Sequence, residues 1–525
     1  MKKHCFYISA FAAILLLSAL LSYSLPTRQL RVMDEYVSVD KAPRIRPDYT
    51  ETFIPPNIAP LNFLVKEPAT QYLVKIYSTT GDTINVFTKT PAIIIPIRPW
   101  KKLLTANRVG KLYFDVYARN KTNQWTRLKT ITNTIANENI DPYLAYRKIR
   151  SVHSSWKRMG IYQRNLQNFD ESLVLNSRFH GGVCLNCHAF ANNRTDKMAI
   201  GFRSSKYGSS ALLVEGGTAK KLGTKFTYTA WHPSGRLVAY SYNKVNQFFH
   251  TARSEVREVV DLDSLLAYYL CDSQTVKTSP NLSKKDRLET YPAWSPDGRY
   301  LYFCSAPILW SDRDKVPPQH YDEVKYDLLR ISYELEKDQW GDLETVLSSE
   351  DTGLSILEPR ISPDGRWLLC CMSDYGSFPV YYQSSDLYII DLKSAEQTGR
   401  FNYRRLDINS DKSESWHSWS SNNRWIAFSS KRDYGLFTRS YFSYVDEQGK
   451  VHKPLILPQK DPAFYDSCIK TYSVPELVTE LVKVRPETFG RLIRSPRKIA
   501  VDLPVTMATP RPEAPPGYGP YQERE

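Results

Sequence analysis

Four copies of one short pattern constrain the fold of this chain more than any other feature of its sequence. Each copy places a tight turn between two apolar, strand-forming runs, and the turn reads Trp-Ser-Pro-Asp-Gly-Arg in its clearest form. Proline sets φ for such a turn, and glycine takes its left-handed position. The copies cover residues 228–241, 291–305, 358–371 and 418–430. Repetition at a spacing of about 60 residues predicts an array of four-stranded sheets with insertions between the strands.

The repeated turn carries a resemblance to a known family. Residues 294–299 read Trp-Ser-Pro-Asp-Gly-Arg and an apolar strand follows, which resembles the WD40-like repeat of TolB-type β-propellers. The resemblance covers residues 185–465 and implies a propeller, with six blades expected, whose central channel and top loops bind partners. The fourth copy lacks the proline and the glycine, which leaves the geometry of its turn open.

A second motif, Cys184-Leu185-Asn186-Cys187-His188, predicts the chemistry of the chain. Two cysteines separated by two residues and followed by histidine are the attachment signature of c-type haem. Each thiol forms a thioether to one vinyl group of the porphyrin, and the histidine supplies the proximal ligand of the iron. We therefore expect one covalent haem c, held by Cys184 and Cys187 and ligated by His188. The cadence of residues 187–202 is that of the repeats, which predicts that the motif opens the first blade.

Half of a zinc site, a redox Cys-x-x-Cys pair and a chance match are the alternatives for this motif. A closed zinc site needs further clustered Cys or His residues. The other cysteines do not form a second pair of this kind: Cys5, Cys271, Cys304, Cys370, Cys371 and Cys468. Cys304 and Cys371 occupy the same strand position in two repeats, which favours a packing role, and Cys370 is expected to face the opposite side of its sheet.

The second axial ligand of the iron is left open by the sequence. Histidine and methionine are the usual choices, and the candidates are His180, Met198 and His232. Met159 and His417 are further residues of the right type. An ordinary structural role is the alternative for each of them. A five-coordinate iron would permit ligand binding or peroxidase-like chemistry.

The beginning of the chain predicts export. Residues 1–24 combine a positive start, an apolar run and small residues before Leu25, the layout of a secretory signal peptide, and the run is also about long enough for an uncleaved signal anchor. Periplasm or cell envelope is where c-type haem is attached, so the two predictions support each other. The net charge of +15 is spread along the chain without a long basic run. We therefore expect a solvated basic surface and no nucleic-acid partner.

The remaining segments predict the domain organisation. Period-two alternation in residues 58–138 predicts an immunoglobulin- or fibronectin-like β-sandwich, and helical spacing at 142–149 predicts a helix. The expected parts are a linker at 25–57, the sandwich at 58–138, a helical or irregular connector at 139–183, the propeller at 184–465, and a C-terminal extension at 466–525 whose Pro-rich last part is disordered.

The sequence thus predicts a mainly β protein, with a sandwich followed by a TolB-like propeller. Taken together, the two motifs resemble the bacterial TolB-like propeller proteins with a haem motif that are called cytochrome c-related. This resemblance implies periplasmic electron transfer or redox sensing, with the propeller face as a docking platform for a protein partner and a membrane tether if the N-terminal segment is kept. A TolB-like scaffold or binding protein without haem is the alternative, and a haem enzyme such as a peroxidase is a further one. A carrier or binding protein is favoured over an enzyme.

Overall fold

The computed structural model describes residues 35–150, 159–178, 182–250 and 255–501, except the side chains of Asn186 and Cys187. The chain is mainly β, as predicted, and divides into two compact units. The first unit holds residues up to 56, 60–137 and 458–466, and the second holds 57–59, 138–457 and the chain from 467 onward. Within the described ranges, no helix has both the length and the apolar character needed to cross a membrane.

The first unit contains two sheets and a helix. Its seven-stranded sheet is formed by β1 (Tyr36–Ser38), β3 (Phe53–Ile54), β5 (Gln71–Tyr77), β6 (Ile84–Thr88), β8 (Lys111–Arg119), β9 (Trp125–Arg127) and β10 (Ile131–Ile135). Its three-stranded sheet is formed by β2 (Ile45–Arg46), β4 (Phe63–Val65) and β7 (Ala92–Ile93), and helix α2 (Ile97–Ala106) precedes β8. Asn62 ties this unit together by donating to the Gln459 and Lys460 carbonyls at 3.3 and 3.0 Å, close to the short helix α5 (Phe464–Ser467).

Two predictions for this unit need correction. Residues 25–57 were expected to form a linker, yet β1, β2 and β3 lie within them and pair with strands of the unit. β1 and β3 pair in parallel with β9 and β10, a long-range contact that leaves no local periodicity in the sequence. The second correction concerns helix α2, which the prediction of a β-sandwich did not include. Its core residues Trp100, Leu103 and Leu104 follow helical spacing. The proline at the start of this segment hid the helical pattern in the sequence.

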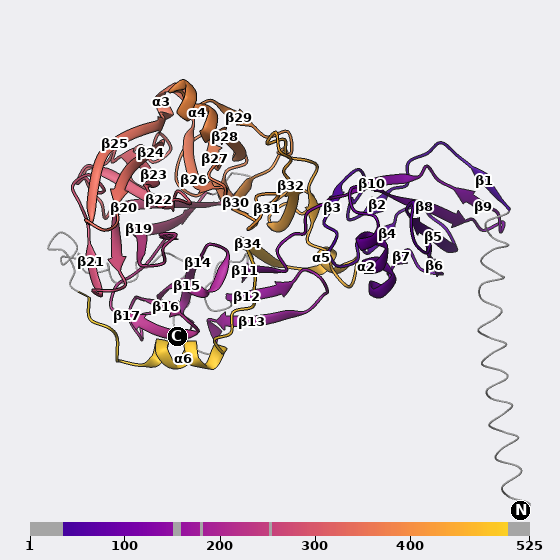
Figure 1. Cartoon of the computed structure of the whole chain (residues 1–525), viewed down its shortest axis with the longest axis horizontal. Helices are drawn as coiled ribbons and strands as arrows, with labels where there is room; N and C mark the ends of the chain where they lie inside the picture. The colour runs from indigo at the N-terminus through magenta and orange to yellow at the C-terminus, as the bar shows by residue number, and fades with distance from the viewer. Residues whose placement is uncertain (1–34, 151–158, 179–181, 251–254, 502–525) are drawn as a thin grey trace, which may run out of the picture. The chain divides into compact units, whose positions relative to one another are not determined.

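The second unit holds six four-stranded antiparallel sheets among its described residues, and Figure 1 shows them arranged around a common centre. The first sheet consists of β11 (Tyr143–Arg150), β12 (Gly160–Asn165), β13 (Glu171–Asn176) and β34 (Lys470–Val478). The next two consist of β14 (Cys184–Ala191), β15 (Arg194–Arg203), β16 (Ser210–Glu215) and β17 (Thr218–Leu222), and of β18 (Thr229–Trp231), β19 (Leu237–Phe249), β20 (Arg257–Leu270) and β21 (Thr275–Lys277).

The fourth to sixth sheets follow the same order along the chain. They consist of β22 (Arg287–Trp294), β23 (Tyr300–Pro307), β24 (Asp327–Glu334) and β25 (Gln339–Leu347); of β26 (Ser355–Ile361), β27 (Trp367–Ser373), β28 (Asp386–Asp391) and β29 (Tyr403–Arg405); and of β30 (Glu414–Trp419), β31 (Trp425–Ser430), β32 (Arg439–Tyr444) and β33 (Leu455–Ile456). Short helices α3 (Ser349–Thr352), η3 (Pro379–Tyr381) and α4 (Leu392–Thr398) lie in the connections.

The first sheet corrects the predicted boundaries. The helix expected at 142–149 is strand β11, and the connector expected at 139–183 contributes three strands. The fourth strand, β34, comes from the segment expected to be an extension beyond residue 465, and it pairs along the length of β11. The haem motif therefore lies in the second sheet, in β14, and does not open the first one.

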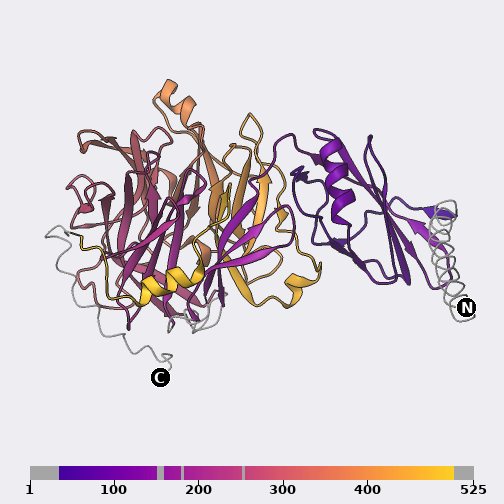
Figure 2. The same ribbon diagram turned by 60° about the horizontal axis from the view of Figure 1, so that its bottom comes forward.

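Apolar clusters lie between successive sheets. The cluster between the first and second sheets is built from residues such as Ile161, Leu175 and Ile200, and helix α6 (Pro486–Arg494) adds Phe489 and Ile493 to it. Similar clusters join the second sheet to the third, the third to the fourth and the fourth to the fifth. Figure 2 shows α6 along the outer side of these sheets, where it contacts β13 and β17. Burial between neighbouring sheets is thus a main force that holds the array together.

The repeated motif forms the predicted tight turns. In the fourth sheet Ser295 Oγ donates to Asp297 Oδ1 at 2.6 Å, and Gly298 has a φ of 74°. The copy without proline and glycine reaches the same geometry, because Ser420 Oγ donates to Asn422 at 2.6 Å and Asn423 adopts a φ of 63°. Asparagine tolerates the left-handed region better than most residues, so the fourth copy keeps its turn.

Candidate functional site

One irregularity recurs in the strands that face the centre of the second unit. In these strands the pairing register shifts, and one residue at the shift has a positive φ: Tyr291 in β22 (53°), Glu358 in β26 (55°), Trp416 in β30 (46°) and Val474 in β34 (51°). Such a β-bulge bends its strand and changes the direction of a side chain. The bulges therefore present a short segment of each strand to the centre.

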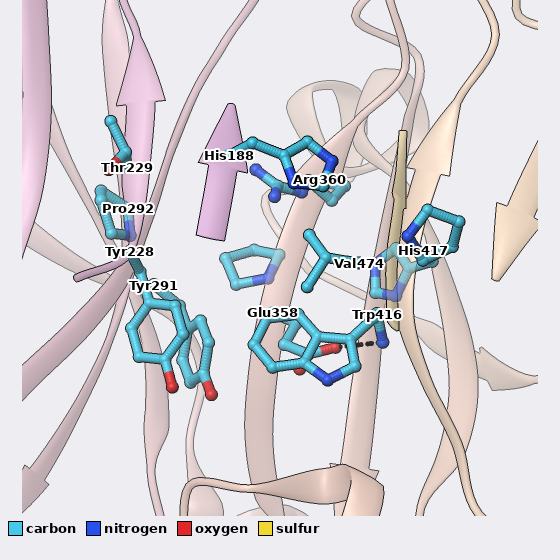
Figure 3. Close-up of a pocket in the computed structure, with 12 residues that line it drawn as sticks. His188, Tyr228, Thr229, Tyr291, Pro292, Glu358, Arg360, Trp416, His417 and Val474 are labelled. Atoms are coloured by element: carbon cyan, nitrogen blue, oxygen red, sulfur yellow. Dashed lines mark hydrogen bonds between the residues drawn. The ribbon is translucent and has the colours of Figure 1, made fainter. Parts of the chain in front are cut away.

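These segments line a small central pocket. The lining residues are His188, Tyr228, Thr229, Tyr291, Pro292, Glu358, Pro359, Arg360, Trp416, His417, Val474 and Pro475. Figure 3 shows His188, Arg360 and His417 along one part of the pocket, with the rings of Tyr228, Tyr291 and Trp416 along another. The centroids of the two tyrosine rings are 4.0 Å apart, and the Tyr228 and Trp416 centroids are 5.8 Å apart. The pocket thus combines imidazole, carboxyl and guanidinium groups with an aromatic wall.

The Cys-x-x-Cys-His motif is placed at this pocket by its backbone register. The pairing of β14 with β15 shifts between Leu185 and His188, the same place in the sheet where the pairs 291–292 and 358–359 form the bulges of β22 and β26. Residues 186 and 187 therefore occupy the register of pocket-lining pairs, and His188 occupies the register of Arg360 and His417. The motif belongs to the innermost strand of its sheet.

Among the motif residues whose side chains are described, His188 lines the pocket. It is 1% exposed, and neither ring nitrogen has a hydrogen-bond partner among the described residues. Burial, and then the positive charge of Arg147, lowers the pKa of His188 to about 3. The ring is therefore neutral at physiological pH, and one of its nitrogens carries an unused lone pair, as a metal ligand requires.

Cys184 lies in different surroundings. It is buried in the apolar cluster between the first and second sheets, and Arg203 donates to its sulfur at 3.5 Å. Met198 and Met159 belong to the same cluster, and the Met159 sulfur accepts from the Leu185 amide at 3.0 Å. Neither methionine lines the pocket beside His188.

The histidines considered as the second ligand of the iron lie in different surroundings. His180 lies outside the described residues. His232 is 5% exposed and serves as a structural link, since its Nδ1 and Ser234 Oγ are 2.7 Å apart and its Nε2 donates to the Gly298 carbonyl at 3.1 Å. His417, named above as a further residue of ligand type, lines the pocket.

A cluster of three ligand-type residues lies beside the pocket. Cys371 Sγ is 3.4 Å from Glu358 Oε2 and 3.6 Å from His417 Nδ1, and one donor atom of each residue lies within 4.8 Å of the others. The Leu369 carbonyl lies 3.1 Å from His417 Nε2. Because a carbonyl can only accept, Nε2 carries the proton and Nδ1 presents its lone pair to the thiol.

Burial dominates the electrostatics of this cluster. It raises the pKa of Glu358 to about 7, against the Trp416 amide, which donates to Oε2 at 2.6 Å. It lowers the pKa of His417 to about 3, helped by the positive charge of Arg360. It also raises the pKa of the Cys371 thiol well above its usual value. A bound cation would reverse the cost of burying the carboxylate and thiolate forms.

Sequence reasoning missed Glu358 and assigned Cys371 to packing. The signal for Glu358 was present, because an acidic residue stands where the aligned copy has Tyr291. Cys370 packs in the apolar cluster between the fourth and fifth sheets, so it faces the opposite side of its sheet from Cys371, as predicted. Cys371 faces the other way and meets a strand of the sixth sheet, a contact that alignment of the repeats does not reveal.

The residues present fit a c-type haem in part. His188 supplies a buried imidazole with an unused nitrogen at the pocket, and the register places Cys187 at the same edge. The thiol of Cys184 is enclosed in the apolar cluster between the first and second sheets. Attachment through Cys184 therefore requires that the thioether form before or during closure of the second sheet on the first.

The buried acid Glu289 gives a testable pH dependence. It is 2% exposed, and burial raises its pKa to about 8. The folded-state pKa of Glu289 lies above its unfolded value. Its contribution to stability is therefore present below the unfolded pKa and is lost progressively as pH rises from there through the folded value of about 8. Between pH 5 and pH 7, the wild type is expected to lose roughly 2 kcal/mol relative to Glu289→Gln. Urea unfolding of both proteins at pH 5 and pH 7 measures this difference. The same change in the free energy of unfolding with pH in both proteins would contradict the prediction.

Comparison with known proteins adds little to this geometry. No family model and no curated protein matches the chain. Solved structures with partial similarity include hydrazine synthase of Kuenenia stuttgartiensis (13% identity, 51% of this chain and 64% of that one, TM-score 0.31), puromycin hydrolase (15%, 60% and 45%, 0.31) and an oligogalacturonate lyase in complex with manganese (13%, 72% and 98%, 0.31). The chain spans less than two thirds of the first two proteins. At these TM-scores the similarities support no conclusion about function.

Proposed function

We propose that this protein is an exported c-type haem protein that transfers electrons or senses redox state, built on a six-bladed β-propeller. The observation that carries the proposal is His188, whose buried imidazole lines the central pocket with no partner on either nitrogen among the described residues. An unpartnered buried polar group is costly. Ligation of iron would satisfy it, and the residue stands directly after two cysteines at haem-attachment spacing.

Each motif residue has a distinct role in this proposal. Cys184 and Cys187 would hold the porphyrin by thioether bonds, and His188 would ligate its iron, which supplies one-electron chemistry. The Tyr228, Tyr291 and Trp416 rings would limit access of water to the pocket. Arg147 and Arg360 place positive charge near His188, which would favour the acidic side chains of a haem.

The propeller part of the proposal rests on the sheet order. Six consecutive sheets have four antiparallel strands each, and β34 from the end of the described chain completes the sheet that β11 begins. Propellers join early and late strands in one blade in this way, which protects the sheet edges. We propose that one face of this propeller docks a protein partner in the periplasm or cell envelope, with the N-terminal segment either removed or kept as a tether.

Haem staining after denaturing electrophoresis tests the cofactor directly. Full-length protein from a host that matures c-type cytochromes in its periplasm is expected to keep its haem through denaturation. Cys184→Ala/Cys187→Ala should remove the stain completely, because no thioether can then form. The matched control is Cys271→Ala/Cys468→Ala, which removes two partly exposed thiols far from the motif in sequence and should stain like the wild type.

A colourless wild-type protein would contradict the haem proposal. The chain would then be a haem-free binding protein, for which the aromatic wall and Arg360 of the pocket are the relevant features. Peroxide-dependent turnover that is lost in His188→Ala would instead indicate a haem enzyme.

A further inference from the structure

Three residues from two neighbouring sheets converge beside the central pocket. Glu358 lies on β26 and Cys371 on β27 of the fifth sheet, while His417 lies on β30 of the sixth. All three are buried, and Glu358 and His417 also line the pocket. We propose that Glu358, Cys371 and His417 bind a divalent transition-metal ion, for which zinc is the best match, and leave one coordination position open to the pocket.

The distances agree with the edges of a zinc tetrahedron. With Zn–S near 2.3 Å and Zn–N or Zn–O near 2.0 to 2.2 Å, tetrahedral angles place sulfur about 3.6 Å from each of the other two donors. The sulfur of Cys371 lies 3.6 Å from His417 Nδ1 and 3.4 Å from Glu358 Oε2. Two of the three distances between donor atoms therefore match a tetrahedron, and one donor atom of each residue lies within 4.8 Å of the others, so one cation can reach all three residues.

The polar atoms around the cluster are arranged for a metal. His417 Nδ1 presents its lone pair to the Cys371 sulfur, because Nε2 donates to the Leu369 carbonyl, and such a second-shell bond orients metal-binding histidines. The Trp416 amide holds Glu358 Oε2, whereas Glu358 Oε1 is buried and has no hydrogen-bond partner among the described residues. A buried carboxylate oxygen without a hydrogen-bond partner can bind a metal ion.

Charge and donor type select the ion. One imidazole, one thiolate and one carboxylate suit zinc and similar borderline metals, whereas calcium and magnesium prefer oxygen ligands alone. A divalent ion with one thiolate and one carboxylate forms a neutral unit, which reduces the cost of burial. Binding replaces the S–H bond of Cys371 by an S–metal bond, and the thiol proton, with the carboxyl proton wherever Glu358 carries one, leaves to solvent. Arg360, the nearby cation, is paired with Glu476 at 3.3 Å.

Three protein ligands with an open position are typical of a site that binds water or a substrate. The open position here faces the same pocket as His188. The site does not require haem, so it is independent of the function proposed above.

Cobalt titration of the haem-free full chain tests the site without interference from haem absorbance. Cys184→Ala/Cys187→Ala protein, stripped with chelator, is expected to bind one Co²⁺ with strong thiolate-to-cobalt charge-transfer absorbance, and Zn²⁺ should displace it. Glu358→Gln, Cys371→Ser and His417→Gln should each weaken binding by about a hundredfold or more, since loss of a second-shell partner alone costs ten- to hundredfold. Circular dichroism identifies which of the three variants fold, and one folded variant is enough for the test.

Cys370→Ser is the matched control, because the neighbouring thiol points into the apolar cluster on the other side of β27. It should leave the cobalt spectrum and affinity unchanged. Absence of the charge-transfer band in the parent protein, or equal cobalt affinity in a folded Cys371→Ser variant, would overturn the metal site. Neither result would affect the haem stain, so the two proposals fail separately.

Discussion

Replacing Arg432 with methionine is expected to lower the free energy of unfolding by about 3 to 5 kcal/mol. Arg432 donates to Glu414 Oε1 at 2.9 Å, and the Glu414 side chain has no exposed surface. Glu414 also accepts from Ser410 and Ser430 hydroxyls at 2.7 Å. Without the guanidinium, a buried carboxylate would lose its counter-charge. The arginine also packs over the Phe428 and Tyr441 rings, so methionine retains part of the apolar contact.

The double variant Arg432→Met/Glu414→Gln separates the charge from the packing. Because it removes both members of the pair, it should recover a large part of the lost stability. Lys483→Met, which breaks an exposed pair with Glu480, should cost less than about 1 kcal/mol. Urea unfolding of the four proteins measures these differences. Equal losses in the single and double variants would show that packing, and not the uncompensated carboxylate, determines the effect. Glu414 lies three residues before His417 on β30. The Arg432–Glu414 ion pair therefore also stabilises the strand that carries His417 of the proposed metal site.

The fold could be predicted where the sequence repeats itself. The turns at 295–298 and 362–365 form as their residue types require, and glycine adopts a φ of 74° in both. The strands on either side of each turn pair with each other, so the information needed is local. The same local chemistry places Asn423 in the left-handed region of the fourth copy, where the motif itself is degenerate.

The first sheet could not be predicted because its information is not local. β11 shows helical spacing of its apolar residues, yet Leu144, Ala145 and Tyr146 are all buried in a strand. Its partner β34 lies more than 300 residues later in the chain, in a segment without a turn motif. A strand that is buried on both faces loses the period-two alternation that identifies strands in a sequence.

One residue of the candidate site could be predicted from the sequence, but its other residues could not. The spacing of the haem motif pointed to His188, which lies at the pocket. Glu358 and Cys371 come from a repeat that was interpreted as structural, and only the bulge at Glu358 and the packing of the fifth sheet on the sixth bring them to His417. A bulge adds one residue to a strand without a strong sequence signal. Alignment of the repeats finds equivalent positions, but it does not show which of them face the centre.

Leu477→Ala is the second substitution for which we expect a large effect. Leu477 is fully buried on β34, where it pairs with Leu144 of β11. Its amide donates to Ser418 Oγ of the sixth sheet at 3.3 Å, and its carbonyl accepts from Asn193 of the second sheet at 2.8 Å. Truncation leaves a cavity at this junction of three sheets, so we expect a loss of about 2 to 5 kcal/mol.

Leu481→Ala is the matched control for this prediction, because the same substitution is made four residues later at a side chain that is 39% exposed. It should change the free energy of unfolding by about 0.5 kcal/mol or less. Thermal and urea unfolding measure both variants. Equal effects would mean that β34 is not an integral strand of the first sheet. A large, selective loss in Leu477→Ala would instead make closure by β34 the step that holds the pocket-lining strands together, since Val474 and Pro475 of the same strand line the pocket.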